Sequence, residues 1–461
     1  MLNFTKVDRN NPLKRGVMER IKDFNEVYTV FDKNKAEEQA DRCIGCGDPY
    51  CHNKCPLHNV IPAWLKQTAT NDLELAFNIS NETSPFPEIL GRICPQDVLC
   101  EGDCTLNDTH GAITIGAVET HISETGFEKG LKPKFAETKI GKKVAVIGSG
   151  PAGISIATFL LREGVDVDMY ERAQKAGGLL TYGIPGFKLD KHRVQRRIDW
   201  LIEAGMNLYT ECEIGKDKSF DELTNSYDAV FLGIGATKGK KPGIDGENND
   251  NVYLAMEFLN AIQKRNFLEE SDKHKDEKVD GFIDVKDKKV VVIGGGDTAM
   301  DCVRTSVREG AKSVKCLYRR DESNMPGSKK EVINSKEEGV EFVFNVSPKS
   351  IETDGVKLIK TQMSEADASG RQSVKEIDGS EYLEEADIVI LALGFDQEVP
   401  SFLTDANLEL DKWNGIKVNE SYQTSNSKIY AGGDGVRGAD LAVTAAADGK
   451  AAAKAIVESF K

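Results

Sequence analysis

The stretch "GKKVAVIGSGPAGISIATFLLREGVDVDMYER", Gly141 to Arg172, has the order strand, tight turn, helix, strand. An apolar run ending at Ile147 leads into the glycines of a G-x-G-x-x-G turn, Gly148, Gly150 and Gly153. Such glycines permit the tight turn, let the backbone approach a pyrophosphate and allow the helix to pack on the strand. The helix that follows, starting at Pro151 and Ala152, would direct its first N–H groups at the phosphates.

This pattern requires an acidic residue at the end of its second strand, and the sequence has one there. Glu171 ends the second expected strand, twenty-three residues after Gly148, and Arg172 follows it. A carboxylate at this position can accept hydrogen bonds from both ribose hydroxyls of an adenosine. Strand, glycine turn, helix and acid together predict a dinucleotide-binding α/β domain, although a tight turn without a ligand is the simpler alternative.

The pattern returns with one chemical difference at "KKVVVIGGGDTAMDCVRTSVREGAKSVKCLYRR", Lys288 to Arg320. Its turn and helix start comprise Gly294, Gly295, Gly296, Asp297 and Thr298. The acid at the end of the second strand is replaced by Arg319 and Arg320. Guanidinium groups can bind the 2′-phosphate of NADP, so the pair favours NADP over NAD. Two arginines at a surface can also be simply solvated.

A third junction of glycines and helix lies near the end of the chain, in "SKIYAGGDGVRGADLAVTAAADGKAAAKAIV", Ser427 to Val457. If the chain returns here to the first domain, Gly433 and Asp434 would meet the ribityl or pyrophosphate region of a flavin. The Ala-rich helix would then start at the isoalloxazine edge, just after Ala439, Asp440 and Leu441. Packing alone is the alternative role for such a helix.

Cysteines are concentrated at the other end of the chain. Seven of the ten precede residue 105: Cys43, Cys46, Cys51, Cys55, Cys94, Cys100 and Cys104. The run "RCIGCGDPYCHNKCP" ends in proline and resembles the ferredoxin arrangement more than the paired Cys-x2-4-Cys spacing of zinc sites. Two 4Fe–4S clusters would need eight ligands, one more than these thiols supply. Cys302 and Cys316, in apolar surroundings, are expected to be buried and without function.

Composition restricts location and partners. The 461 residues suggest roughly three domains of about 150 residues. No apolar run is long enough to span a bilayer, and the N-terminus lacks a secretory or transit pattern, so we expect a cytoplasmic protein without a membrane partner. The formal net charge of −15 opposes binding to nucleic acid.

The order of these motifs closely resembles the small, or beta, subunit family of bacterial NADPH-dependent glutamate synthase. The resemblance extends over "GGLLTYGIPGFKLDK", "YRRDESNMPGSKKE" and "AGGDGVRGADL". It implies an α/β fold in which an N-terminal helical iron–sulfur domain precedes two Rossmann-like domains, with the NADP domain inserted into the FAD domain. The implied domains are residues 1–140 for the clusters, 141–240 and 398–461 for FAD, and 241–397 for NADPH.

The resemblance also implies where the chain crosses between domains. The strand-like stretches 227–236 and 386–395 would be the two crossings, each ending in glycine beside a nucleotide, the second at Gly394. The charged stretch 263–281 would be an exposed loop leading into the NADPH domain. The flavin side would be lined by Gly178, Leu179, Gly183, Ile184, Pro185 and Lys188, although Ile184 and Pro185 could merely shape a turn.

The N-terminal domain is similar to the iron–sulfur module of dihydropyrimidine dehydrogenase. By that resemblance one cluster would take Cys43, Cys46, Cys51 and Cys104. The other would take Cys55, Cys94, Cys100 and one further ligand. The dehydrogenase uses a glutamine there, and the matching position holds Glu119. A solvated helix carboxylate is the alternative for Glu119.

The implied activity is hydride transfer from NADPH to FAD, which needs no catalytic acid or base. The clusters would pass electrons to a large (alpha) subunit that makes glutamate from glutamine and 2-oxoglutarate, in a hetero-oligomer. One alternative is an NADPH:ferredoxin-type oxidoreductase subunit. Another, from a different class, is a zinc-bound, nucleotide-sensing scaffold without turnover.

Overall fold

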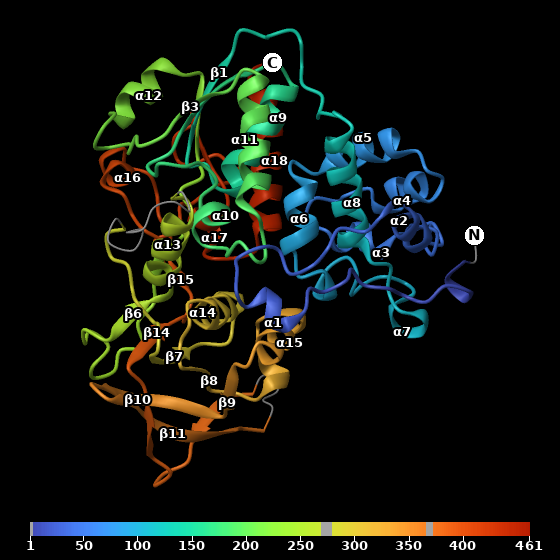
Figure 1. Cartoon of the computed structure of the whole chain (residues 1–461). Helices are drawn as coiled ribbons and strands as arrows, with labels where there is room; N and C mark the ends of the chain where they lie inside the picture. Colours follow the sequence, from blue (N-terminus) through green and yellow to red (C-terminus); the bar gives the residue numbers. More distant parts are fainter. Residues whose placement is uncertain (1–2, 269–278, 366–371) are drawn as a thin grey trace.

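The computed structural model describes residues 3–268, 279–365 and 372–461. Figure 1 shows a body of helices from the N-terminal part of the chain beside two α/β bodies. The helices are η1 (Asn3–Thr5), α1 (Val17–Arg20), α2 (Lys33–Ala40), α3 (Tyr50–Lys54), α4 (Ile61–Ala69), α5 (Leu73–Thr83), α6 (Pro87–Ile93), η2 (Gln96–Val98), α7 (Asn107–His110) and α8 (Ile115–Glu128).

Local sequence sets several of these helix starts. Asp32 caps α2 by accepting a hydrogen bond from the backbone N–H of Lys35, and α4 and α6 each carry proline in their first turn. Helices α6 and α8 approach each other through two glycines, because a Cβ added to Gly91 would lie 2.8 Å from the carbonyl oxygen of Gly116. This contact packs α8 against α6, the helix that leads directly into Cys94.

The first α/β body is built on a parallel sheet with strand order β16-β4-β1-β2-β3. Helices cover both faces, which explains why the central strands are apolar throughout. The strands are β1 (Lys143–Ile147), β2 (Asp166–Tyr170), β3 (Asn207–Tyr209), β4 (Ala229–Leu232) and β16 (Ile429–Ala431). The helices are α9 (Pro151–Arg162), α10 (Leu179–Tyr182), α11 (Lys191–Glu203), α12 (Phe220–Ser226), α16 (Ser401–Asp405), α17 (Asp434–Arg437) and α18 (Ala442–Ser459).

The C-terminal helix α18 packs directly on α9. Ser155 Oγ donates a hydrogen bond to the carbonyl oxygen of Ala446 at 2.6 Å, and a Cβ on Gly449 would lie 2.4 Å from that of Ala152. Only small side chains permit this approach. The Ala-rich composition of α18 therefore brings the last segment of the chain to the start of α9.

The second α/β body is inserted between β4 and β16 of the first. Its parallel sheet has the order β6-β14-β7-β8-β9, from β6 (Val252–Leu254), β7 (Lys289–Ile293), β8 (Ser313–Tyr318), β9 (Glu341–Phe344) and β14 (Ile388–Leu391). Its helices are α13 (Ala255–Asn266), α14 (Asp297–Arg308), η3 (Glu322–Asn324) and α15 (Lys329–Glu337). An antiparallel sheet covers the other face, with β10 (Val346–Glu352), β11 (Gly355–Met363), β12 (Val374–Glu376) and β13 (Tyr382–Glu385).

The two connections between the bodies lie side by side, because β5 (Lys238–Gly239) pairs antiparallel with β15 (Phe395–Asp396). The predicted fold class, with one dinucleotide fold inserted into another, is confirmed. Cys302 and Cys316 are buried in α14 and β8, also as predicted.

The prediction of an exposed loop over 263–281 is wrong at its start. Helix α13 continues to Asn266, and Gln263 is buried. Apolar residues at helical spacing, Phe258, Leu259 and Ile262, fix this helix against the sheet and outweigh the charged composition that follows. Residues 269–278 lie outside the described part of the chain.

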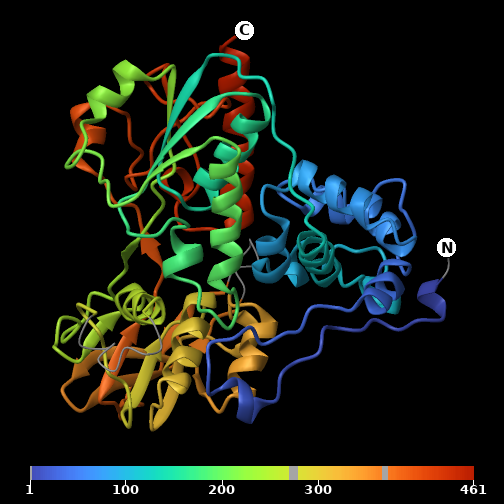
Figure 2. The same ribbon diagram turned by 45° about the horizontal axis from the view of Figure 1, so that its top comes forward.

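An N-terminal arm, residues 7–30, runs from the helical body to the inserted body, where α1 lies beside α15 (Figures 1 and 2). Lys14 Nζ lies 2.8 Å from Glu337, and the Tyr28 hydroxyl donates to Asn334 Oδ1 at 3.1 Å. The N–H of Val27 donates to the carbonyl oxygen of Phe187 in the first α/β body. The arm thus ties all three bodies together.

The centre of this contact is the buried carboxylate of Glu338. It accepts hydrogen bonds from Arg20 Nε at 2.8 Å, Arg304 Nε at 2.9 Å and Arg308 Nη1 at 2.7 Å. Burial alone would raise the pKa of Glu338, but the guanidinium groups outweigh it and lower the pKa to about 2.

We predict that Glu338→Gln lowers the stability by about 3–5 kcal/mol at pH 7, because it leaves buried guanidinium groups unpaired. Because the pKa of Glu338 in the folded protein is lower than its ordinary value of 4.5, the ionised carboxylate stabilises the fold at pH values above 4.5. This stabilisation is lost as the pH falls toward about 2. The difference between the unfolding midpoints of wild type and variant should therefore narrow below pH 4.5. Glu409→Gln, at an exposed pair with Lys417, is the control and should change little. A difference that is independent of pH would contradict this account.

Candidate functional site

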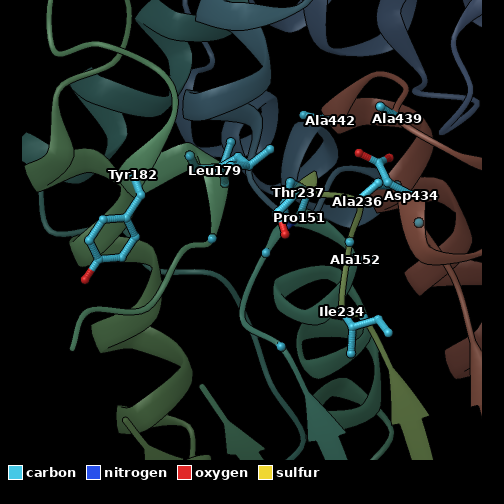
Figure 3. Close-up of a pocket in the computed structure, with 18 of the residues that line it drawn as sticks. Pro151, Ala152, Leu179, Tyr182, Ile234, Ala236, Thr237, Asp434, Ala439 and Ala442 are labelled. Carbon is cyan, nitrogen blue, oxygen red and sulfur yellow. The ribbon is translucent and has the colours of Figure 1, made fainter. Parts of the chain in front are cut away.

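A single cavity of about 810 Å³ lies where the two α/β bodies meet the helical body. Both glycine turns open on it, the first at Gly148 and Gly150 and the second at Gly296. Figure 3 shows residues of α10, Leu179 and Tyr182, on one side, and Asp434 with Ala439 from the C-terminal segment on the other. The cavity is therefore shared by segments that are distant in the sequence.

Among the helices that begin at this cavity are the three long helices α9, α14 and α18. The residues before α9, α14 and α18 are Gly150, Gly296 and Leu441, and none of them caps its helix with a side chain. The first two N–H groups of an α-helix have no intrahelical partner, so at these three starts they are available to anionic ligand atoms. A Cβ added to Gly150 or Gly296 would meet no protein atom within 4 Å, which leaves a cradle for phosphates at each turn.

Glu171 is held at the cavity wall by the first turn. Its Oε2 accepts hydrogen bonds from the N–H of Ser149 at 3.1 Å and from Ser149 Oγ at 2.5 Å, and its Oε1 accepts from the N–H of Ala173 at 2.8 Å. Among the residues that the structure describes, no cationic side chain pairs with this carboxylate, and the backbone and Ser149 orient it. This geometry fits a group that receives hydrogen bonds from ribose hydroxyls.

Most of the residues singled out from the sequence line this cavity. They are Gly148, Gly150, Pro151, Ala152, Glu171, Arg172, Gly178, Leu179, Ile184, Lys188, Gly296, Asp297, Thr298, Gly394, Gly433, Asp434, Ala439, Asp440 and Leu441. Burial raises the pKa of Asp434 to about 7.

Some of the expected residues do not line it: Gly153, Gly183, Pro185, Gly294, Gly295, Arg319 and Arg320. Two of them serve the turns instead, because a Cβ on Gly153 would lie 2.0 Å from the carbonyl oxygen of Gly148, and one on Gly294 would lie 2.2 Å from that of Ala392. Arg319 and Arg320 lie at the end of β8 and line a separate cavity of about 440 Å³ with Ser364, Gln372 and Ser373.

Several lining residues were not predicted. Met256, Asn260 and Lys264 present one face of α13, at a spacing of four that could have indicated this face. Asp301 lies one turn into α14, and its Oδ1 is 2.9 Å from Lys188 Nζ of the other α/β body. Burial opposes the charge on Lys188, but Asp301, Glu331 and Asp297 outweigh it and raise its pKa.

The seven N-terminal cysteines and Glu119 fall into two groups. The thiol of Cys51 interacts electrostatically with those of Cys43, Cys46 and Cys104. The thiol of Cys100 interacts with Cys94, Cys55 and the carboxyl of Glu119. Burial, followed by the thiols of Cys104 and Cys43, raises the pKa of Cys51 to about 12. Burial, followed by the carboxylate of Glu101 and then by the thiols of Cys94 and Cys55, raises the pKa of Cys100 well above its usual value. Thiolates at these positions would need a nearby cation, which iron supplies.

In the described ranges, no three His, Cys, Asp or Glu side chains come close enough to hold a single metal ion. A 4Fe–4S cluster binds each ligand to a different iron atom, so four separated thiols fit it. The groups also differ in position, because Ile93, Cys94 and Pro95 line the large cavity, whereas Cys46 lies in an exposed loop beside Thr105. We call them the inner group (Cys55, Cys94, Cys100 and Glu119) and the outer group (Cys43, Cys46, Cys51 and Cys104).

Glu119 is buried on α8, so the alternative of a solvated carboxylate is wrong. Its Oε1 accepts a hydrogen bond from Asn59 Nδ2 at 2.8 Å, and burial raises its pKa to about 8. Asn59 is itself held, since its Oδ1 accepts from Trp64 Nε1 at 3.2 Å. A buried, oriented carboxyl beside three thiols fits a ligand whose proton is displaced by a metal.

None of the helices in the described part of the chain is long and apolar enough to cross a membrane.

Comparison with known proteins agrees with this arrangement. Residues 142–449 match the family model described as pyridine nucleotide-disulphide oxidoreductase, and residues 20–131 match dihydropyrimidine dehydrogenase domain II, 4Fe-4S cluster. The solved structure of Mycobacterium tuberculosis FprA in complex with NADPH has a TM-score of 0.58 at 20% identity, over 69% of this chain and 84% of that chain. Fold and site therefore define a pyridine nucleotide-linked oxidoreductase joined to a 4Fe–4S domain.

Relatives that the chain matches over nearly its whole length identify the family within this class of oxidoreductases. The chain is 47% identical to the glutamate synthase [NADPH] small chain of Escherichia coli K12, over 98% of both chains. It is 43% identical to that of Azospirillum brasilense, over 99% of this chain and 95% of the relative. The putative oxidoreductase AegA of Escherichia coli is 46% identical, and the match covers 69% of its length. The chain belongs to the family of NADPH-dependent glutamate synthase small chains, which are oxidoreductases, as its motifs predicted.

The two glycine cradles give a paired prediction. We expect Gly150→Ala to weaken FAD binding and Gly296→Ala to raise the KM for NADPH, each by about tenfold, because the new methyl group enters only the ligand's space. Flavin content and steady-state NADPH oxidation measure the two effects. Gly16→Ala, which also meets no atom within 4 Å but lies in the N-terminal arm, is the control. Loss of folding in either variant, or exchange of the two effects, would contradict the assignment of the turns.

Proposed function

We propose that this chain takes hydride from NADPH to FAD and passes the electrons through two 4Fe–4S clusters to the large chain of a glutamate synthase. The large chain would use them to form glutamate from glutamine and 2-oxoglutarate. The observation that carries the proposal is the shared cavity, which both glycine turns and Cys94 of the inner group line. When bound, FAD supplies the step from two-electron to one-electron chemistry that clusters require.

The residues of this chain bind and orient the nucleotides. The FAD would lie along the first turn, with its adenosine ribose at Glu171 and its flavin end between α10 and the start of α18. The NADPH would cross the start of α14, with its 2′-phosphate at Arg319 and Arg320 and its nicotinamide in the cavity. Holding the two reacting rings together is the main contribution of the protein, and no acid or base is needed.

The positions of the two groups of iron–sulfur ligands set the order in which electrons would pass through the clusters. The inner group borders the cavity and would hold the first cluster, and the outer group lies nearer the surface and would hold the second. Electrons would therefore leave through the exposed loop around Cys46, where a large chain docks. All ten cysteines are free, which suits the reducing cytoplasm we assign to this protein.

NADPH oxidation by the native complex of small and large chains tests the function. We expect oxidation that depends on glutamine plus 2-oxoglutarate and yields glutamate. Oxidation that ignores both substrates but responds to ferredoxin would assign the chain to the ferredoxin-type alternative. A protein with zinc in place of iron and acid-labile sulfide, and without NADPH oxidation, would be the scaffold.

The cavity at Arg319 and Arg320 predicts coenzyme preference. Replacing both with alanine should raise the KM for NADPH by about ten- to a hundredfold, because charged hydrogen bonds to the 2′-phosphate are lost. The KM for NADH, which lacks this phosphate, should change little. Equal effects on both coenzymes in steady-state assays would remove the arginines from phosphate recognition.

The proposed role of Glu119 as a ligand of the inner cluster gives a prediction for the iron content of the protein. Glu119→Ala should reduce the iron content by up to about half, since one of two clusters loses a ligand. Glu128→Ala, an exposed carboxylate on the same helix, is the matched control. Iron analysis and electron paramagnetic resonance measure the loss, and an unchanged iron content with unchanged cluster spectra would reject Glu119 as a ligand.

A further inference from the structure

Arg42 is a fully buried arginine directly before the first cysteine of the outer group. Its guanidinium group donates only to backbone carbonyl oxygens: from Nε to Val7 at 3.0 Å, from Nη1 to Ala112 at 2.8 Å, and from Nη2 to His110 at 2.6 Å and Gly111 at 2.9 Å. Each nitrogen of the group therefore has an acceptor, with four hydrogen bonds for its five N–H donors. The positive charge of the group is not balanced, because these acceptors are neutral.

Other buried arginines of this protein show the contrast. Arg197 pairs with Glu88 at 2.6 Å, and Arg20 and Arg304 each lie 2.8 Å from Glu338. Within the described residues, Arg42 has no carboxylate within ion-pair distance. Burial, followed by repulsion from Arg9, lowers the pKa of Arg42. A buried charge without a counter-charge is costly, so its place in the fold requires a negative partner.

Two groups of the required sign act on Arg42: the thiol of Cys104 in the outer group and, with a smaller effect, the exposed carboxylate of Asp8. The thiol of Cys104 is an electrostatic neighbour that favours the charged form of Arg42, and Cys43 is the adjacent residue. Four thiolates around a 4Fe–4S core with two positive charges carry a net charge of −2. One-electron reduction takes this to −3 without a proton, so a nearby buried cation stabilises the reduced form more than the oxidised form.

The inner group has a different environment. The cation that acts on Cys55 is Lys450 of α18, which is half-buried and donates to the carbonyl oxygens of Leu57 at 3.0 Å and Thr83 at 3.1 Å. Glu119 adds a carboxyl to this group, whereas the outer group contains thiols alone. The stronger unbalanced positive charge therefore lies at the outer group.

We propose that Arg42 is the counter-charge of the outer cluster and raises its reduction potential, so that electrons are drawn from the cavity side toward the surface. The inference rests on the proposed function, because it needs a cluster at the outer cysteines. It assigns to Arg42 a tuning role through the cluster and no contact with substrate. The one electron gained by the outer cluster is the one released by the inner cluster.

Arg42 also fastens the N-terminal arm and residues 110–112, so the test must separate charge from structure. Arg42→Gln removes the charge and retains side-chain donors, whereas Arg42→Lys retains the charge and loses the fork of donors. Arg197→Gln, which breaks a buried ion pair remote from the cysteines, is the control for lost stability. All variants are prepared as iron-loaded holoenzyme and titrated anaerobically, with the cluster signals followed by electron paramagnetic resonance.

We expect Arg42→Gln to reduce the ratio of reduced to oxidised outer cluster at least tenfold at a fixed potential, about 59 mV for a one-electron couple. Arg42→Lys and Arg197→Gln should stay within about twofold of wild type. An unchanged ratio in Arg42→Gln, or an equal shift in Arg42→Lys, would overturn the proposal. If Arg42→Gln loses its iron, the test rests on Arg42→Lys alone. This variant keeps the positive charge, so a tenfold shift in its ratio of reduced to oxidised outer cluster would refute the role of charge. Wild-type protein without cluster signals would instead refute the proposed function.

Discussion

The docking of one loop of the first α/β body on helix α14 of the second is the contact on which the site depends. The guanidinium groups of Arg304 and Arg308 lie over the ring of Phe187, 4.4 and 4.0 Å from its centroid, and the next residue, Lys188, pairs with Asp301 on the same helix. The arginines are themselves held by Glu338. Without this docking, the two glycine turns would open on separate surfaces, and two nucleotides could not share one cavity.

The same arrangement determines where electrons can leave. The helical body packs against the cavity through the segment 93–95, so the inner group of cysteines lies beside the expected flavin and the outer group lies beyond it. Burial makes isolated thiolates and the Glu119 carboxylate unfavourable in both groups, as their raised pKa values show. Iron would relieve that cost, which couples the fold of this domain to its clusters.

The amino-acid sequence alone could predict the features of the fold and the site that depend on local chemistry. The glycine turns, Glu171 and the return of the chain at Gly433 were all predicted from short motifs, because phosphate cradles and tight turns require particular residues at fixed spacing. Residues brought in by tertiary packing could not be predicted this way. Asp301 lies on a helix face that carries no motif, and the burial of Gln263 and Glu119 depends on neighbours far away in the sequence. The separate cavity at Arg319 and Arg320 likewise depends on Ser364, which follows β11, and Ser373, which precedes β12.

The central claim is that electrons pass from the cavity through the inner group before they reach a partner. The most direct test compares wild type with Cys94→Ser in complex with the large chain, measuring flavin reduction by NADPH in a single turnover and glutamate formation in steady state. The account predicts that flavin reduction keeps its wild-type rate while glutamate formation is lost, since only the exit is blocked. Glutamate formation at the wild-type rate would contradict it.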